Sequence, residues 1–175
     1  MKKAFTVCAV ICIFLSFDCR QKEKKNFQNR EISEPELPVQ KKPISIVSGS
    51  RVYVPAYARA FSYRNEQTVS LVTTLAVHNT DMENPIFLRK IEYYSEGGRL
   101  LKEFMKEPKI LGPMATAVYP LVPEKEGAGI GANAVVEWVS EHKVSRPVIE
   151  AIMISEGTLG ISFISPGYSV KKITE

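Results

Sequence analysis

Apolar and polar residues alternate along much of the chain after residue 50. Residues 70–79 place four positions on one side of an extended chain, Leu71, Thr73, Leu75 and Val77. Residues 84–94 do the same with Phe87, Ile91 and Tyr93. Successive side chains of a strand point to opposite faces, so a period of two is typical of a strand with one buried face. Both segments are therefore predicted to be strands that cover a core.

Further segments rich in β-branched, aromatic and aliphatic residues are 52–57, 100–105, 115–122, 132–140, 148–155 and 161–165. Residues 96–99 (EGGR) predict a hairpin turn, and residues 111–113 and 165–167 predict breaks between strands. The pattern contains no convincing amphipathic helix. About eight short strands without alternating helices predict an all-β fold, an antiparallel β-sandwich of immunoglobulin-like type. A small β-barrel is the alternative.

The N-terminal residues read as a targeting segment. Two lysines precede the mainly apolar residues 4–17, and residues 1–19 therefore have the order of a signal peptide. Cys19 ends this run in LSFDC, which resembles the processing site where bacterial lipoproteins receive their lipid. Ser16 and Asp18 depart from the usual pattern of Leu three residues before the cysteine and a small residue directly before it. An ordinary secretory peptide or an uncleaved anchor is the alternative.

A polar segment separates this leader from the strands. Residues 20–43 are charged, contain prolines and show no sustained apolar period, which is typical of a flexible linker. Residues 44–175 are then the folded β-sandwich domain. The arrangement predicts an exported protein held by a lipid on Cys19 at a membrane of the cell envelope, with the domain facing the periplasm or the cell exterior.

Charge and cysteine content exclude several classes of function. Residues 1–43 hold nine Lys and Arg against five Asp and Glu, which leaves fourteen of each for residues 44–175. The domain is formally neutral, so a basic nucleic-acid-binding face has no support. All three cysteines lie in residues 1–19, so the domain has no disulfide, no thiolate nucleophile and no Cys-ligated zinc. No HExxH or G-x-S-x-G motif is present, and catalysis is not expected.

Two sets of acidic residues are candidate cation sites. Asp81, Glu83 and Asn84 gather in a predicted turn, where their oxygens suit Ca²⁺ and where Asx-turn capping explains them equally well. Glu137 and Glu150 would face each other if residues 132–140 and 148–155 formed a hairpin. Like charges in that position would require separation, a shared proton, Arg146, Lys143 or a divalent metal ion. Both glutamates pointing to solvent is the alternative.

Other candidates are less specific. The glycine-rich residues 127–131 invite comparison with a phosphate-binding loop, but no Lys and helix follow, so a flexible connection is the better interpretation. Tyr53 and Tyr57 belong to an aromatic group near the first strand that could contact a protein or a glycan of the envelope. Trp138 is predicted to belong to the core, because it shares the apolar face of residues 134 and 136.

Four segments carry a resemblance to a known family: VYVPAYARAF, LAVHNTDMENPIFLRKIEYYSEGGRLLKEFMKEPKILGPMATAVY, GANAVVEW and PVIEAIMISEGTLGISFISPG. In this order, over about residues 51–167, they resemble the bacterial envelope family catalogued as domain of unknown function 3124. Residues 124–131 are less similar to that family's usual acidic, Ser- and Gly-rich loop. The resemblance implies an envelope location and supplies no activity, ligand or catalytic residue. Taken together, the sequence predicts a lipid-anchored binding or structural module, with a cation-binding protein or metal-dependent enzyme as the alternative.

Overall fold

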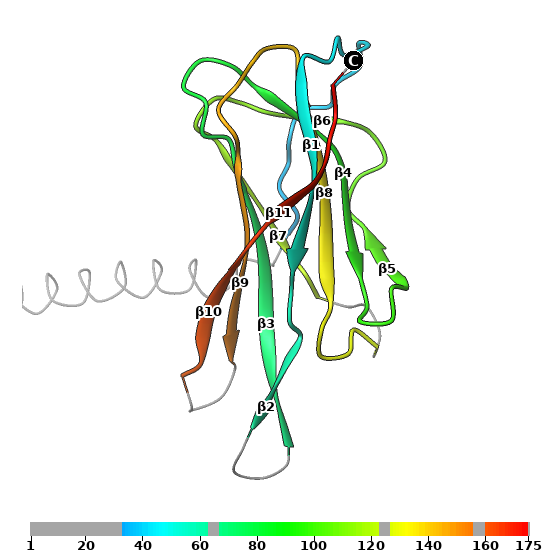
Figure 1. The fold of residues 1–175 in the computed structure, drawn as a ribbon, viewed down its shortest axis with the longest axis vertical. Helices are drawn as coiled ribbons and strands as arrows, with labels where there is room; N and C mark the ends of the chain where they lie inside the picture. Colours follow the sequence, from blue (N-terminus) through cyan, green and yellow to red (C-terminus); the bar gives the residue numbers. More distant parts are fainter. Residues whose placement is uncertain (1–32, 63–66, 123–126, 156–159, 175) are drawn as a thin grey trace, which may run out of the picture. The chain divides into compact units, whose positions relative to one another are not determined.

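The computed structural model describes residues 33–62, 67–122, 127–155 and 160–174. Within these residues the chain forms eleven strands, all paired antiparallel in two sheets. Figure 1 shows how the strands are arranged. The predicted antiparallel β-sandwich is therefore confirmed. No helix in the described residues is long and apolar enough to cross a membrane.

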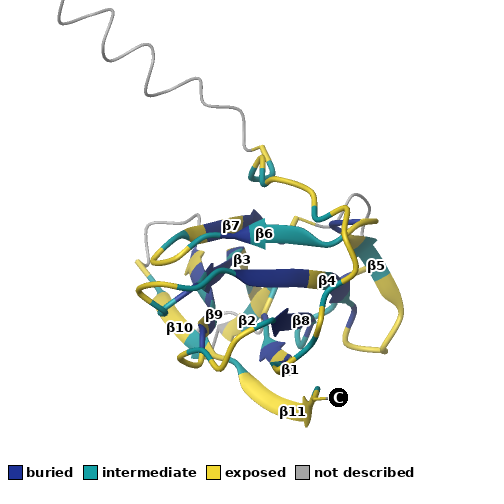
Figure 2. Cartoon of the chain, turned by 90° about the horizontal axis from the view of Figure 1, so that it is seen from above, coloured by how far each residue is buried: buried dark blue, intermediate teal, exposed yellow. Residues whose placement is uncertain are grey.

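The first sheet has six strands in the order β11 (Tyr168–Lys172), β1 (Ser48–Pro55), β8 (Asn133–Ser140), β4 (Ile86–Tyr94) and β5 (Leu100–Glu103), with β6 (Lys109–Leu111) also paired to β4. The second has five strands in the order β10 (Ser162–Pro166), β9 (Val148–Ser155), β3 (Gln67–His78) and β2 (Arg59–Ser62), with β7 (Thr116–Pro120) also paired to β3. The core fills the space between the sheets. Figure 2 shows buried residues gathered on the central strands and an exposed β11.

The predicted faces of the longest strand are confirmed. Leu71, Thr73, Leu75 and Val77 of β3 are all buried. The Thr73 hydroxyl donates a hydrogen bond to the carbonyl of Tyr57 at 2.8 Å, so this polar side chain is satisfied inside the core. Trp138 belongs to the core cluster, as its position on the apolar face of β8 predicts.

In β4 one predicted face is wrong. A register shift between Leu88 and Lys90 inserts an extra residue, so Leu88 and Ile91 both lie on the core side, opposite Trp138 and Val136 of β8. Phe87 pairs with Val139 and lies on the other face from Ile91 and Tyr93. Bulges of this kind break the period of two without changing composition, so alternation alone places Phe87 incorrectly.

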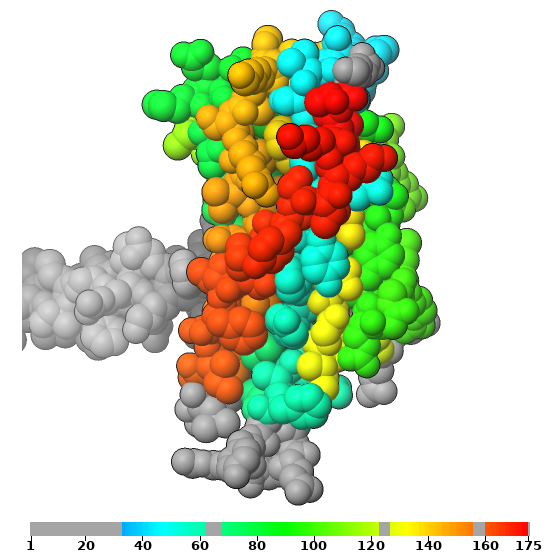
Figure 3. Space-filling model, viewed as in Figure 1, coloured from blue at the N-terminus to red at the C-terminus, as the bar shows by residue number. Residues whose placement is uncertain are grey.

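The predicted turn at residues 96–99 joins β4 to β5 as a hairpin, and Gly98 has a φ of 75° there. The break at residues 165–167 has a different consequence. Gly167 separates β10, in the second sheet, from β11, in the first, so the chain passes from one sheet to the other at this residue. Figure 3 shows these two segments running obliquely across one face of the molecule. Strands β2, β6 and β11 were not among the predicted segments.

The predicted hairpin between residues 132–140 and 148–155 does not form. Strand β8 lies in the first sheet between β1 and β4, whereas β9 lies in the second sheet between β3 and β10. Both edges of β8 are already paired, so no edge is available for β9. Residues 141–147 therefore cross from one sheet to the other.

The compact unit begins at Glu34 and includes the last part of the predicted linker. Val39 forms a β-bridge with Lys109, and Glu34 forms an ion pair with Lys102 at 2.9 Å. These contacts attach the segment to β5 and β6, which both pair with β4. The predicted signal peptide, with Cys19, lies outside the described residues.

Candidate functional site

Glu137 lies on the outer face of the first sheet, where it is held by two arginines. Arg51, directly opposite on β1, donates from Nη2 and Nε to Oε2 at 2.9 and 3.2 Å. Arg89 Nε lies 3.5 Å from Oε1. The counter-charge thus comes from arginines on neighbouring strands of the same sheet, not from Arg146 or Lys143, and the carboxylate is engaged in a structural ion-pair network.

Glu150 lies on the other sheet, so the predicted juxtaposition of the two glutamates is wrong. Its Oε1 is 4.0 Å from Nε2 of His78, whose Nδ1 is 2.9 Å from the Thr116 hydroxyl. Within the described part of the chain, no group of three or more His, Cys, Asp or Glu side chains is arranged to hold a metal ion.

Asp81 is the centre of a hydrogen-bonded turn. Its Oδ1 accepts from the backbone N–H groups of Glu83 and Asn84 at 3.1 and 2.8 Å, and its Oδ2 accepts from the N–H of Ser145 at 3.0 Å. Asn84 Nδ2 adds a further donor at 3.2 Å. Hydrogen bonds from the backbone N–H groups of Ser145, Asn84 and Glu83 lower the pKa of Asp81 to about 2. This geometry supports the Asx-turn interpretation over the Ca²⁺ site.

We expect this carboxylate to contribute to acid sensitivity. Because its folded pKa of about 2 lies below the ordinary value of 3.8, its stabilising effect is present above pH of about 4 and is lost as pH falls toward 2. Asp81→Asn should therefore lower the unfolding temperature at neutral pH and flatten its decline between pH of about 5 and 2. Thermal unfolding followed by circular dichroism across this range measures the slope. Glu83→Gln, in the same turn, is the control, and a wild-type slope in Asp81→Asn would contradict the assignment.

Asn79 ties this turn to a second connection. It is 2% exposed, and its Nδ2 donates to the carbonyls of Asn84 and Gly112 at 2.9 Å and of Leu111 at 3.2 Å. Its Oδ1 accepts from the N–H of Asp81 at 3.0 Å. One buried amide thereby joins the β3–β4 connection to the β6–β7 connection.

The same turn positions a third connection, between β8 and β9. The Thr80 hydroxyl donates to the carbonyl of Arg146 at 2.9 Å, next to the bond between Ser145 and Asp81. These two bonds fix the backbone of Arg146 at the end of the sandwich where β1 begins and β8 ends.

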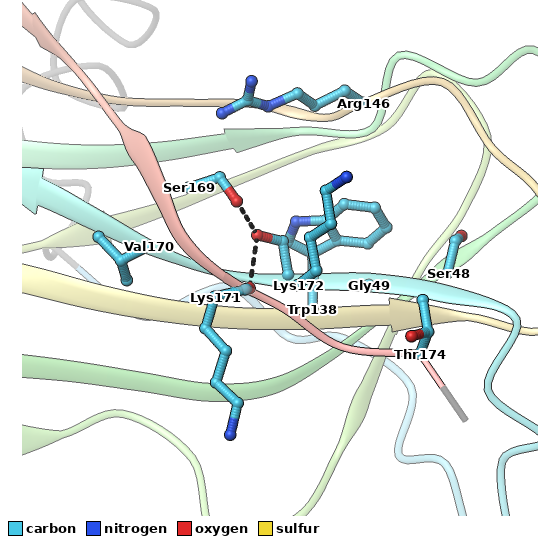
Figure 4. Close-up of a pocket in the computed structure, with 10 residues that line it drawn as sticks. Ser48, Gly49, Trp138, Arg146, Ser169, Val170, Lys171, Lys172 and Thr174 are labelled. Carbon is cyan, nitrogen blue, oxygen red and sulfur yellow. Dashed lines mark hydrogen bonds between the residues drawn. The ribbon is translucent and has the colours of Figure 1, made fainter.

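A pocket of about 540 Å³ lies at this end of the sandwich. Its lining comes from the start of β1, the end of β8, the β8–β9 connection and β11, and includes Ser50, Trp138, Arg146, Ser169 and Lys172 (Figure 4). The hydroxyl of Ser50 is hydrogen-bonded to that of Ser169 and donates to the carbonyl of Lys171 at 3.0 Å. These bonds attach β11 to β1 on one side of the pocket.

Two exposed aromatic pairs lie on another part of the surface. Tyr53 of β1 is directly opposite Tyr168 of β11, and the ring centroid of Tyr57 is 6.1 Å from that of Phe163. The four side chains are between 37% and 58% exposed. The predicted candidates Tyr53 and Tyr57 are thus exposed to a partner. Their aromatic neighbours, Tyr168 and Phe163, lie far from them in the sequence, and the sequence pattern does not predict these pairs.

The glycine-rich residues 127–131 bind a carboxylate of the same chain, that of Glu96. The Glu96 carboxylate accepts hydrogen bonds from the N–H groups of Ile130 and Gly131 at 2.8 and 3.4 Å. A Cβ on Gly129, whose φ is 74°, would lie 2.3 Å from the Glu96 carboxyl carbon. The loop therefore packs around an internal carboxylate.

Sequence reasoning missed the pocket residues as a group. The sequence pattern places Trp138 in the core, offers Arg146 only as a counter-charge for the glutamates, and does not predict β11. Ser50, Trp138, Arg146 and Lys172 come from four separate segments without a shared motif. Only the pairing of β11 with β1 and the turn at Asp81 bring them together.

Comparison with known proteins identifies a family. No curated protein matches the chain. A solved structure titled "Crystal Structure of Thermotoga maritima 1070" is 12% identical, covering 69% of this chain and 93% of that one, with a TM-score of 0.42. Similarity at that level supports no statement about this fold or function. A family model matches residues 49–170. This range contains β2 to β10 completely, together with most of β1 and the first part of β11. The chain belongs to the family described as protein of unknown function (DUF3124).

Proposed function

We propose that this protein is an exported module of the cell envelope, anchored to a membrane by a lipid on Cys19, which binds an envelope protein or glycan without catalysis. The order of leader, polar segment and β-sandwich along the sequence supports the anchored arrangement. The domain would face the periplasm or the cell exterior. The attached lipid supplies membrane affinity that residues 44–175 do not need to provide themselves.

The exposed aromatic pairs carry the binding part of this proposal. Tyrosine buries a large area at low entropic cost when a partner covers it, and it is enriched at protein interfaces. Tyr53 and Tyr168 are cross-strand neighbours on β1 and β11, and the rings of Tyr57 and Phe163 form a second pair. These side chains lie on strands or next to them, so the surface they offer is held in place by the sheets.

The candidate acidic residues favour a non-catalytic role over the metal-dependent alternative. Glu137 is paired with Arg51 and Arg89, and the oxygens of Asp81 accept hydrogen bonds from N–H groups. A carboxylate that serves as a metal ligand or general base needs an available lone pair facing the substrate or ion. In both residues each carboxylate oxygen already faces at least one donor of the protein itself, which reduces what it can offer an ion or substrate.

Labelling and crosslinking of the full-length protein in bacterial cells test both parts. Wild type should incorporate a labelled fatty acid and fractionate with membranes, whereas Cys19→Ala should lose both properties. A photoreactive phenylalanine analogue at Tyr53 should yield a specific crosslinked product, and the same analogue at Met82, which is 80% exposed, serves as the control position.

Each outcome has a separate meaning. Equal labelling of wild type and Cys19→Ala contradicts the anchor. Equal crosslinking from Tyr53 and Met82 contradicts the aromatic binding surface. A crosslinked protein identifies a protein partner, whereas retention on isolated cell-wall glycan that is lost in Tyr53→Ala identifies a glycan.

A further inference from the structure

The pocket at the end of the sandwich has a positively charged lining. Arg146, Lys171 and Lys172 contribute to it, and none of the described residues that line it is acidic. Figure 4 shows the side chain of Lys171 turned away from Trp138, on the side opposite to Arg146 and Lys172. Arg146 and Lys172 are therefore the two cations of the pocket itself.

These two charges have no internal counter-ion in the described part of the chain. The ion pairs there involve Arg51, His78, Arg89, Lys90 and Lys102, and none involves Arg146 or Lys172. By contrast, two arginines on the outer face of the first sheet, Arg51 and Arg89, are both paired with Glu137. Like charges that line one concave surface repel each other and raise the local concentration of anions.

A buried donor faces the same pocket. Trp138 is 5% exposed, and its indole Nε1 is buried without a hydrogen-bond partner among the described residues. In Figure 4 the nitrogen edge of the ring is on the side of the pocket where Ser169 lies. A buried N–H without an acceptor is unfavourable, and an acceptor that enters the pocket relieves it. Nε1 of Trp138 is not accessible to solvent in this structure. Side chains of the pocket therefore have to move before an acceptor can reach it.

The two cations are held by the backbone around them. Arg146 is fixed through its own carbonyl, which accepts from Thr80, and through the neighbouring bond between Ser145 and Asp81. Lys172 is paired with Ser50 across the β11–β1 register, and that register shifts between Arg51 and Val52. The shift places Lys172 and Ser169 on the same side of β11 and turns Lys171 the other way. The pocket is thus part of the fold.

We propose that this pocket binds a small organic oxyanion, a carboxylate or phosphate group attached to an apolar or flat body. Arg146 and Lys172 bind the charged group, because guanidinium and ammonium groups form charge-assisted hydrogen bonds with both oxyanions. Val170, the indole ring of Trp138 and the aliphatic part of the Lys172 side chain contact the apolar or flat body of the ligand. The volume of about 540 Å³ falls within the usual size of small-molecule sites and exceeds the needs of a bare inorganic ion. This site goes beyond the proposed anchor and aromatic surface, and does not depend on them.

Fluorescence of Trp138 provides a direct test, because it is the single tryptophan of the chain. Full-length protein in detergent is titrated with phenyl phosphate, benzoate, inorganic phosphate and neutral benzyl alcohol at a constant ionic strength of about 0.15 M. Phenyl phosphate or benzoate should change the emission of Trp138 saturably, and benzyl alcohol should not. The tighter of the two identifies the preferred charged group.

Charge-matched variants locate the site. Arg146→Gln and Lys172→Gln should each raise the dissociation constant about tenfold or more, because each removes a charge-assisted hydrogen bond. Lys171→Gln removes the same charge nearby and should change it less than about twofold at this salt concentration. Unchanged thermal unfolding shows that the variants keep their fold.

Several results would overturn the proposal. These are the absence of a saturable change with either oxyanion, equal binding of benzyl alcohol, and equal weakening by Lys171→Gln and Lys172→Gln. Inorganic phosphate binding as tightly as phenyl phosphate would contradict the organic ligand. Fatty-acid labelling at Cys19 and crosslinking from Tyr53 are unaffected by each of these results, so the proposed function and this site fail separately.

Discussion

Replacing Asn79 with alanine is expected to lower the free energy of unfolding by about 3 kcal/mol, although the residue contributes little to the apolar core. Its amide donates to three carbonyls from two connections and accepts from the N–H of Asp81, all in a region without solvent access to the side chain. Alanine removes all four bonds, and although the Gly112 carbonyl keeps the N–H of Ala115, the carbonyls of Leu111 and Asn84 and the N–H of Asp81 each lose this partner. Each unsatisfied buried group costs about 1–3 kcal/mol, and partial relaxation of the loops reduces the total.

Asn84→Ala is the matched control, because it makes the same substitution in the same turn. The Asn84 side chain makes one hydrogen bond, 3.2 Å long, to Asp81 and is only partly buried, so its loss should cost less than about 1 kcal/mol. Urea unfolding of both variants gives the comparison. Equal losses in the two variants would show that Asn79 does not join the connections in the way its bonds indicate.

The alternation of residues was sufficient to predict where most strands lie and which side of β3 is buried. It was insufficient where the structure departs from regular pairing. In β4 the register shift after Leu88 moves Phe87 away from the face of Ile91, and nothing in the local sequence marks that shift. The sequence does not predict strand β11, because YSVKK alternates over only four residues and ends in two lysines, and all five of its residues are exposed.

Strand neighbours were harder to predict than strands. The segments that became β8 and β9 are consecutive, apolar and separated by a short connection, which fits a hairpin as well as a crossing between sheets. The decision depends on β1 and β4, which occupy both edges of β8. Glu137 therefore meets Arg51 and Arg89, and the acidic pair predicted with Glu150 never forms.

The candidate site was predictable only in part for the same reason. Local turn chemistry gave the Asx turn at Asp81 as one of two interpretations, because its bonds join residues close in sequence. The pocket depends on long-range pairing, with Ser50 and Lys172 on adjacent strands and Arg146 held by Thr80. Such a site has no spacing in the sequence that would reveal it.

Gly167→Ala is expected to destabilise the protein by about 2–3 kcal/mol, because it adds a methyl group where two sheets meet. A Cβ at this position would lie 2.6 Å from Cγ1 of Val52 and 2.7 Å from the carbonyl oxygen of Ile149. Val52 is a buried core residue, and the Ile149 carbonyl accepts the N–H of Gly167 at 2.8 Å. The position of the alanine Cβ is fixed by the backbone, so no rotamer change can move it away from the Ile149 carbonyl oxygen. The junction between β10 and β11 therefore has to move.

Gly112→Ala separates this steric effect from a general effect of replacing glycine. A Cβ on Gly112 meets no atom within 4 Å, so this variant should stay within about 1 kcal/mol of wild type. Displacement of the junction in Gly167→Ala should also move Ser169 and Lys172, which follow it on β11 and line the pocket. We therefore expect a changed emission of Trp138 in folded Gly167→Ala and an unchanged emission in Gly112→Ala. Wild-type stability and emission in Gly167→Ala would mean that the passage between the sheets tolerates a side chain, contrary to the close packing of Gly167 against Val52 and Ile149.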